Sequence, residues 1–140
     1  MFNQINLFYP LFAQVGITFV VWLWMYKTRL REIKKLAIRP EEIATDHELT
    51  EKLNNVVAPS DNFKNLFEIP VLFYVLILSL YITNNGNEVF VILLSLFVAT
   101  RAVHSIIHCT YNRVVHRFYA YVVSAIILWV MIIRAFITVL

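Results

Sequence analysis

The sequence predicts an all-α integral membrane protein, folded as a bundle of four transmembrane helices. Of its 140 residues, 60% are hydrophobic and only 15% are charged, with a mean hydropathy of +0.69, whereas charged residues make up about 25% of an average soluble domain. Four apolar stretches are each long enough to cross roughly 30 Å of hydrocarbon. The 2 glycines and 4 prolines are too few for the turns of a β-barrel, so helices must satisfy the backbone in lipid.

The four expected helices occupy about residues 7–26, 61–82, 89–110 and 116–139 of a single domain covering 1–140. The first lacks a basic start and a small-residue cleavage site, so we expect a retained anchor. Residues 27–60 have mixed charge and predict a cytoplasmic loop with one short helix at Arg39-Pro40-Glu41-Glu42. Proline suits the first turn of a helix, and acidic residues suit its positive end. Asparagine and glycine at 83–87 predict a turn.

Basic residues gather in the first and third connections and are missing from both tails. The positive-inside rule therefore places these connections in the cytoplasm and both termini outside it. We expect a multi-pass protein of a bacterial inner membrane. The net charge of +3 then indicates contact with anionic lipid, and no nucleic-acid partner is expected. The single Cys109 excludes an internal disulfide, and we interpret it as a small apolar residue of a helix.

Glu68 lies two residues before Pro70, in a segment that otherwise favours lipid. An ionised carboxylate there costs a few kcal/mol on insertion scales, so a partner is expected. Asn65, three residues earlier, would share its helix face, and a cation from another helix would complete the set. The alternative is that Glu68 lies in the membrane interface and is solvated.

Arg101, His104 and His108 are spaced to share one face of the third helix. Charged or titratable groups facing lipid would be costly, so this face should look toward protein or a water-filled cleft. The four-residue spacing of the two histidines also suits a metal or haem iron. No third ligand is evident, so we predict no metal site.

Arg117 and Tyr121 lie one turn apart near the start of the fourth helix. The second, third and fourth helices thus place polar groups at the same depth, which predicts an anion-binding pocket between them. Arg113 and His116 are expected to contact lipid headgroups instead.

In these residues the sequence resembles the MAPEG family, the membrane-associated proteins in eicosanoid and glutathione metabolism, over the whole chain. The second helix of that family carries Asn-x-x-Glu followed shortly by proline, matched here by Asn65, Glu68 and Pro70. Its third and fourth helices carry Arg-x-x-His, then an arginine and a tyrosine four residues apart. The matching residues here, which also keep the spacing between the two arginines, are Arg101, His104, Arg117 and Tyr121.

The resemblance implies a homotrimer with glutathione, as a cosubstrate, in a cleft between neighbouring subunits that is open to the cytoplasmic side. The residues implied to bind glutathione are Arg29, Arg31, Lys64, Asn65, Glu68, Arg101, His104 and His108. The implied catalytic residues are Arg117, which would stabilise the thiolate, and Tyr121, which would donate a hydrogen bond to sulfur. The chain departs from many glutathione-using relatives in having Lys64 in place of arginine, which loses a bidentate fork, and His108 in place of tyrosine.

Two functions remain open at this point. The first is a glutathione transferase or peroxidase that acts on lipophilic electrophiles dissolved in the membrane. Glutathione carries two carboxylates and one ammonium group, so several cations and an acid suit it. The second is a non-catalytic lipid-binding or helper protein of the same fold. The sequence does not name the electrophile, nor does it decide between conjugation, isomerisation and peroxide reduction.

Overall fold

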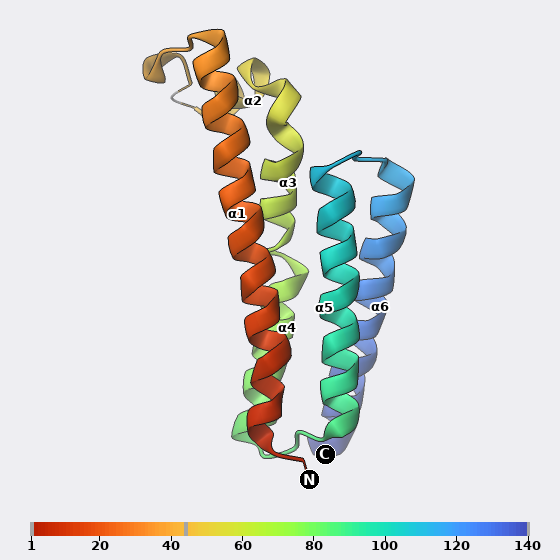
Figure 1. The fold of residues 1–140 in the computed structure, drawn as a ribbon. Helices are drawn as coiled ribbons and strands as arrows, with labels where there is room; N and C mark the ends of the chain where they lie inside the picture. The colour runs from red at the N-terminus through yellow and green to blue at the C-terminus, as the bar shows by residue number, and fades with distance from the viewer. Residues whose placement is uncertain (1, 44, 140) are drawn as a thin grey trace.

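The computed structural model describes residues 2–43 and 45–139. Its long helices are α1 (Phe8–Leu36), α3 (Val57–Asn65) followed by α4 (Ile69–Ile82), α5 (Glu88–Cys109) and α6 (Val114–Val139). They run side by side along one axis (Figure 1). Four stretches, in which α3 and α4 count as one, are long and apolar enough to cross a membrane. The predicted membrane four-helix architecture is confirmed, and the chain is an integral multi-pass membrane protein.

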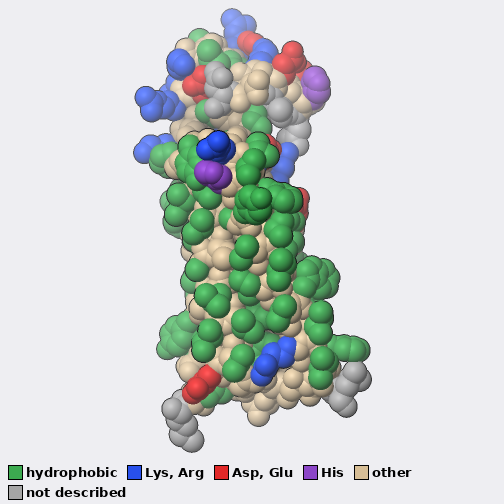
Figure 2. Space-filling model, turned by 90° about the vertical axis from the view of Figure 1, so that its right-hand side faces the viewer, with side chains coloured by type: hydrophobic (Ala, Val, Ile, Leu, Met, Phe, Trp, Pro, Cys, Tyr) green, Lys and Arg blue, Asp and Glu red, His purple; other side chains and the backbone are tan. Residues whose placement is uncertain are grey.

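Both chain termini lie at one end of the bundle, which we call the terminal end (Figure 1). The connections between α1 and α3 and between α5 and α6 lie toward the opposite end, the loop end. Figure 2 shows hydrophobic side chains over most of the visible face of the bundle, with most of the charged side chains at the loop end. This distribution suits a lipid-facing surface. The placement of the termini outside the cytoplasm stays a prediction.

Helix α1 extends well past the expected end at residue 26. It stops at Leu36, where Ala37 adopts a left-handed φ of 51° and its N–H caps the carbonyls of Ile33 and Lys34. The segment after residue 26 is rich in lysine, arginine and leucine, which favour helix. Lysines in the last turn also suit the negative end of the helix. The apolar run therefore marked the edge of the membrane and not the end of the helix, so part of the expected loop 27–60 is helical.

The second expected helix, 61–82, is interrupted at residues 66–68 between α3 and α4. Glu68 has φ −98° and ψ −101°, outside the helical region. Pro70, in the first turn of α4, lacks an N–H to continue the helical ladder and restricts the residue before it. The sequence had suggested that Asn65 and Glu68 share one face of a continuous helix. The break between them excludes this arrangement. Glu68 is exposed at the break.

The core of the bundle lies toward the terminal end and combines aliphatic side chains with three phenylalanines. Phe73 of α4 stacks on Phe97 of α5 with ring centroids 4.6 Å apart, and neither ring is exposed. At the terminal end, the Gln4 side chain donates a 3.2 Å hydrogen bond to the Gly86 carbonyl, which ties the first residues to the turn before α5. These contacts fix the halves of the helices nearest the terminal end. They thereby help to position the polar groups that lie nearer the loop end.

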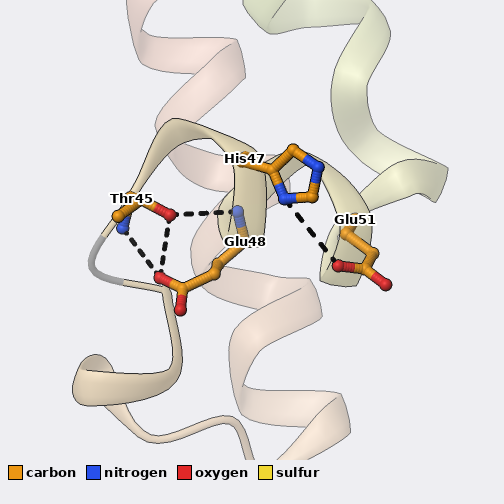
Figure 3. A network of polar contacts seen from close by, with 4 residues as sticks. All are labelled: Thr45, His47, Glu48 and Glu51. Carbon is orange, nitrogen blue, oxygen red and sulfur yellow. Dashed lines mark hydrogen bonds and ion pairs between the residues drawn. The ribbon is translucent and has the colours of Figure 1, made fainter.

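The loop between α1 and α3 contains the 3-10 helix η2 (Pro40–Ile43), α2 (Asp46–Lys52) and η3 (Asn54–Val56). A short helix was expected at Pro40. Helix α2 begins with a capping box: the Glu48 backbone N–H donates to Thr45 Oγ1 at 3.3 Å, and the Thr45 N–H donates to Glu48 at 3.0 Å (Figure 3). In the first turn of α2, His47 lies 4.0 Å from Glu51, one turn further along the helix. The loop therefore has its own local order outside the membrane.

An ion pair joins η2 to α2, in which Lys52 donates to the Glu42 carboxylate and holds the pKa of Glu42 below its usual range. A lowered native pKa contributes stability above the unfolded pKa, near 4.3, and this is lost as the pH falls through the native value. The protection factors against hydrogen exchange in peptides covering 40–52, corrected for the intrinsic pH dependence of exchange, should therefore fall a few-fold on acidification. Lys52→Met should exchange faster already at neutral pH. An identical pH dependence in both proteins would contradict a role for this pair.

Candidate functional site

A pocket of about 250 Å³ lies toward the loop end between α3, α5 and α6. Its lining combines cationic, imidazole, amide, carboxylate and aromatic groups. The lining residues are Asp61, Asn65, His104, His108, Val114, Arg117, Phe118 and Tyr121. Polar groups from the second, third and fourth membrane segments therefore meet at one depth, as the sequence indicated.

The polar face of α5 points into the protein. The exposed fractions are 0% for Arg101, 3% for His104 and 1% for His108. Their spacing along one side of the helix turns all three away from lipid, where a charge would be costly. The expectation that this face looks toward protein is confirmed by that burial.

Arg101 is a fully buried cation with incomplete hydrogen bonding. Its Nη2 donates to the backbone carbonyl of Asn65 at 3.1 Å, and its guanidinium lies 5.7 Å from the centre of the Tyr121 ring. The helix break after Asn65 leaves that carbonyl free to accept. Nε and Nη1 of Arg101 are buried and have no partner among the described residues.

Arg117 is held by groups from α5 and from the connection that follows it. Its Nη1 lies 2.7 Å from His108 Nε2 and donates to Asn112 Oδ1 at 2.9 Å. Its backbone carbonyl lies 2.9 Å from His104 Nδ1. Tyr121 follows one turn along α6, with its ring centre 5.9 Å from that of His104. The half-buried Arg117 thus has a fixed position at the pocket wall.

Five of the eight expected glutathione-binding residues do not line this pocket. One of them is Arg101, which is fully buried. Arg29 of α1 instead donates to Ser60 Oγ of α3 at 2.6 Å. Arg31, Lys64 and Glu68 are exposed. A single chain therefore brings together Asn65, the two histidines and the two residues of α6, but not the cations of α1 or the exposed pair beside the α3–α4 break.

Three lining residues, Asp61, Val114 and Phe118, were not identified from the sequence, and neither was Asn112, which accepts a hydrogen bond from Arg117. Asp61 lies one helical turn before Asn65, and this spacing alone could have placed it in the pocket. Asn112 was assigned only to the connection between α5 and α6, where it adopts a left-handed φ of 46°. Asparagine tolerates this conformation well, but no local signal pairs its side chain with Arg117.

Four apolar helices around a buried arginine–histidine cluster define a multi-pass membrane protein with a polar site inside the bundle. The chain belongs to the MAPEG family, whose family model matches residues 7–137. The resemblance noted in the sequence is thereby confirmed, and the family in general comprises membrane proteins of glutathione-related transferase or peroxidase type. Comparisons with curated proteins and with solved structures find no match.

Proposed function

We propose that this protein is a membrane-bound, glutathione-dependent transferase or peroxidase that acts on lipophilic electrophiles. The observation that carries the proposal is the placement of Arg117. Its Nη1 is committed to His108 and Asn112, whereas Nε and Nη2 have no partner in the described part of the chain. A guanidinium that is fixed on one side and free on the other is suited to hold negative charge at a defined place.

The charges around the pocket complement those of glutathione. Arg101 and Arg117 supply cations for its carboxylates and for a thiolate. Asp61 lines the pocket and supplies a carboxylate for the ammonium group, and Glu68 of a neighbouring chain would supply another in the trimer proposed below. The unpartnered Nε and Nη1 of Arg101 are buried, and a bound anion would satisfy one of them. This need of Arg101 for an anion is a second support for the proposal.

The thiolate of glutathione is the nucleophile in this scheme. An ordinary thiol has a pKa of about 8.5, and a nearby guanidinium favours the thiolate. In conjugation, the sulfur forms a bond to an electrophilic carbon while the electron pair of the broken bond leaves with the displaced group. Arg117 would stabilise the charge on sulfur before attack, and the Tyr121 hydroxyl would donate a hydrogen bond to it.

The pocket is also placed to receive a substrate from lipid. Two of its lining residues, Val114 and Phe118 at the start of α6, have 62% and 59% of their surface exposed. An apolar rim of this kind would admit an electrophile dissolved in the bilayer without passage through water. The same rim suits the other function considered, a lipid-binding protein, so turnover must separate them. Purified protein in detergent should conjugate a chromogenic electrophile with glutathione; binding without any turnover would favour the non-catalytic alternative.

We further propose a homotrimer in which neighbouring chains complete the site. The exposed Lys64 and Glu68 and the cations of α1 lie outside the pocket of their own chain, as expected if they serve the pocket of a neighbour. Native mass spectrometry of protein in mild detergent should give three subunits, and Lys64→Ala should weaken glutathione binding several-fold without changing that mass. An isolated monomer that binds glutathione as tightly as the unfractionated protein would contradict a site shared between chains.

A further inference from the structure

We propose that His108 is a positioning residue, which holds the guanidinium of Arg117 only while its imidazole is neutral and carries its proton on Nδ1. The effect on a bound thiol rests on the function proposed above. The hydrogen bond itself rests on the geometry of this chain alone. His108 does not need to touch the ligand for this role, because it acts through Arg117.

The tautomer follows from what each partner is able to do. An arginine guanidinium has only donors and stays protonated in proteins. Nη1 of Arg117 lies 2.7 Å from His108 Nε2, so Nε2 must accept, and the proton of the neutral ring must be on Nδ1. A protonated His108 would present an N–H to an N–H, which removes the hydrogen bond and adds repulsion between two cations.

This contact also fixes which edge of Arg117 remains for a ligand. Nη1 carries two hydrogens, and they are used by His108 and by Asn112 Oδ1 at 2.9 Å. Two acceptors on one nitrogen fix the plane of the guanidinium as well as its position. The edge formed by Nε and Nη2 is left over, and an anion in the pocket would bind there.

His104 fixes the same residue through its backbone. The Arg117 carbonyl can only accept, so His104 Nδ1, at 2.9 Å, must donate. Both histidines of α5 are therefore in the Nδ1–H form, and α5 holds Arg117 once by its side chain and once by its main chain. Because the two rings stand one helical turn apart, one element sets both contacts.

Charged and titratable groups from three helices surround His108. The charged and titratable groups around it on α5, α6 and α3 are Arg101, His104, Arg117, Tyr121 and Asp61. Two of these are permanent cations, and the single carboxylate belongs to an exposed residue of α3. A third positive charge on a side chain that is 1% exposed is unfavourable.

The tautomer is open to direct measurement by nitrogen NMR of the histidine side chains, on the full chain in detergent micelles without glutathione. His108→Gln identifies the signal of interest by its disappearance. We expect a neutral His108 with its proton on Nδ1 at neutral pH. A cationic His108, or one with its proton on Nε2, would overturn the proposal. This result does not depend on any activity.

The consequence for a thiol is measured by the ultraviolet absorbance of bound glutathione thiolate as the pH is varied. His108→Leu removes the acceptor and should lower the thiolate fraction at neutral pH about tenfold, the usual weight of a hydrogen bond to a charged group. His108→Gln offers an acceptor that does not titrate, so it should stay within about twofold of wild type and extend thiolate formation to lower pH. His116→Gln, on an exposed histidine, is the matched control and should behave as wild type.

A double mutant separates positioning from direct contact. In an Arg117→Ala background, His108→Leu should change the thiolate fraction by less than about twofold, because no guanidinium remains to be held. An equal loss in both backgrounds would show that His108 acts on the ligand itself and would overturn the inference. A wild type that binds glutathione but forms no thiolate would refute the proposed function. The NMR measurement alone would then test whether His108 accepts a hydrogen bond from Arg117.

Discussion

Arg117→Ala is expected to lower the thiolate fraction and kcat at neutral pH by about a hundredfold or more, the usual effect of removing a fixed group that stabilises developing charge. The affinity for glutathione should fall much less, because other cations bind its carboxylates. The side chain is only half-buried, so the fold should persist. Thiolate absorbance and turnover of a chromogenic electrophile measure the two effects separately.

Arg113→Ala is the matched control for this variant. Arg113 is exposed in the connection just before α6 and has no place in the pocket lining, so both thiolate and turnover should be unchanged. If Arg117→Ala forms thiolate and turns over as wild type does, then Arg117 is an anchor to lipid headgroups. The assignment of the thiolate to this residue would then be wrong.

Arg101→Met is expected to abolish most glutathione binding while leaving the ligand-free protein as stable as before, within about 1 kcal/mol. A buried cation with two unpartnered N–H groups contributes little to the fold by itself. When an anion is bound, the loss of one partner of a buried charge pair costs about 2 kcal/mol or more, which is roughly a thirtyfold loss of affinity. Glutathione should accordingly stabilise wild type against heat but not this variant.

Arg134→Met provides the comparison at the opposite end of the bundle. Arg134 lies 5.4 Å from the Phe90 ring centre, far along α6 from the pocket, so its removal should not alter glutathione affinity. An Arg101→Met protein that unfolds without ligand yet still binds glutathione normally would show that the hydrogen bond to Asn65 is structural. Arg101 would then have no role in recognition.

The architecture was predictable because lipid imposes simple rules. Apolar runs of sufficient length had to be helices, and a charged face such as that of Arg101 and His104 had to turn inward. The burial of these two residues follows from the helical period alone. The same rules placed Arg117 and Tyr121 at matching depth on α6, so most of the pocket lining was expected from spacing.

Other features needed the fold. The sequence does not show that Asn65 contributes a backbone carbonyl to Arg101, because that carbonyl is free only where the chain breaks before Pro70. The side-chain partners of Arg117 also come from tertiary packing: His108 is on another helix, and Asn112 depends on a left-handed turn. Hydropathy likewise marks where a chain leaves the membrane, but α1 continues as helix beyond that point.

The most direct test of the account is a titration of glutathione onto purified wild-type protein at neutral pH, followed by ultraviolet absorbance. The account predicts a saturable thiolate signal at a pH where free glutathione is mostly protonated, and predicts that Arg117→Ala removes this signal while retaining most of the affinity. Saturable binding of glutathione with no thiolate signal in the wild type would contradict it.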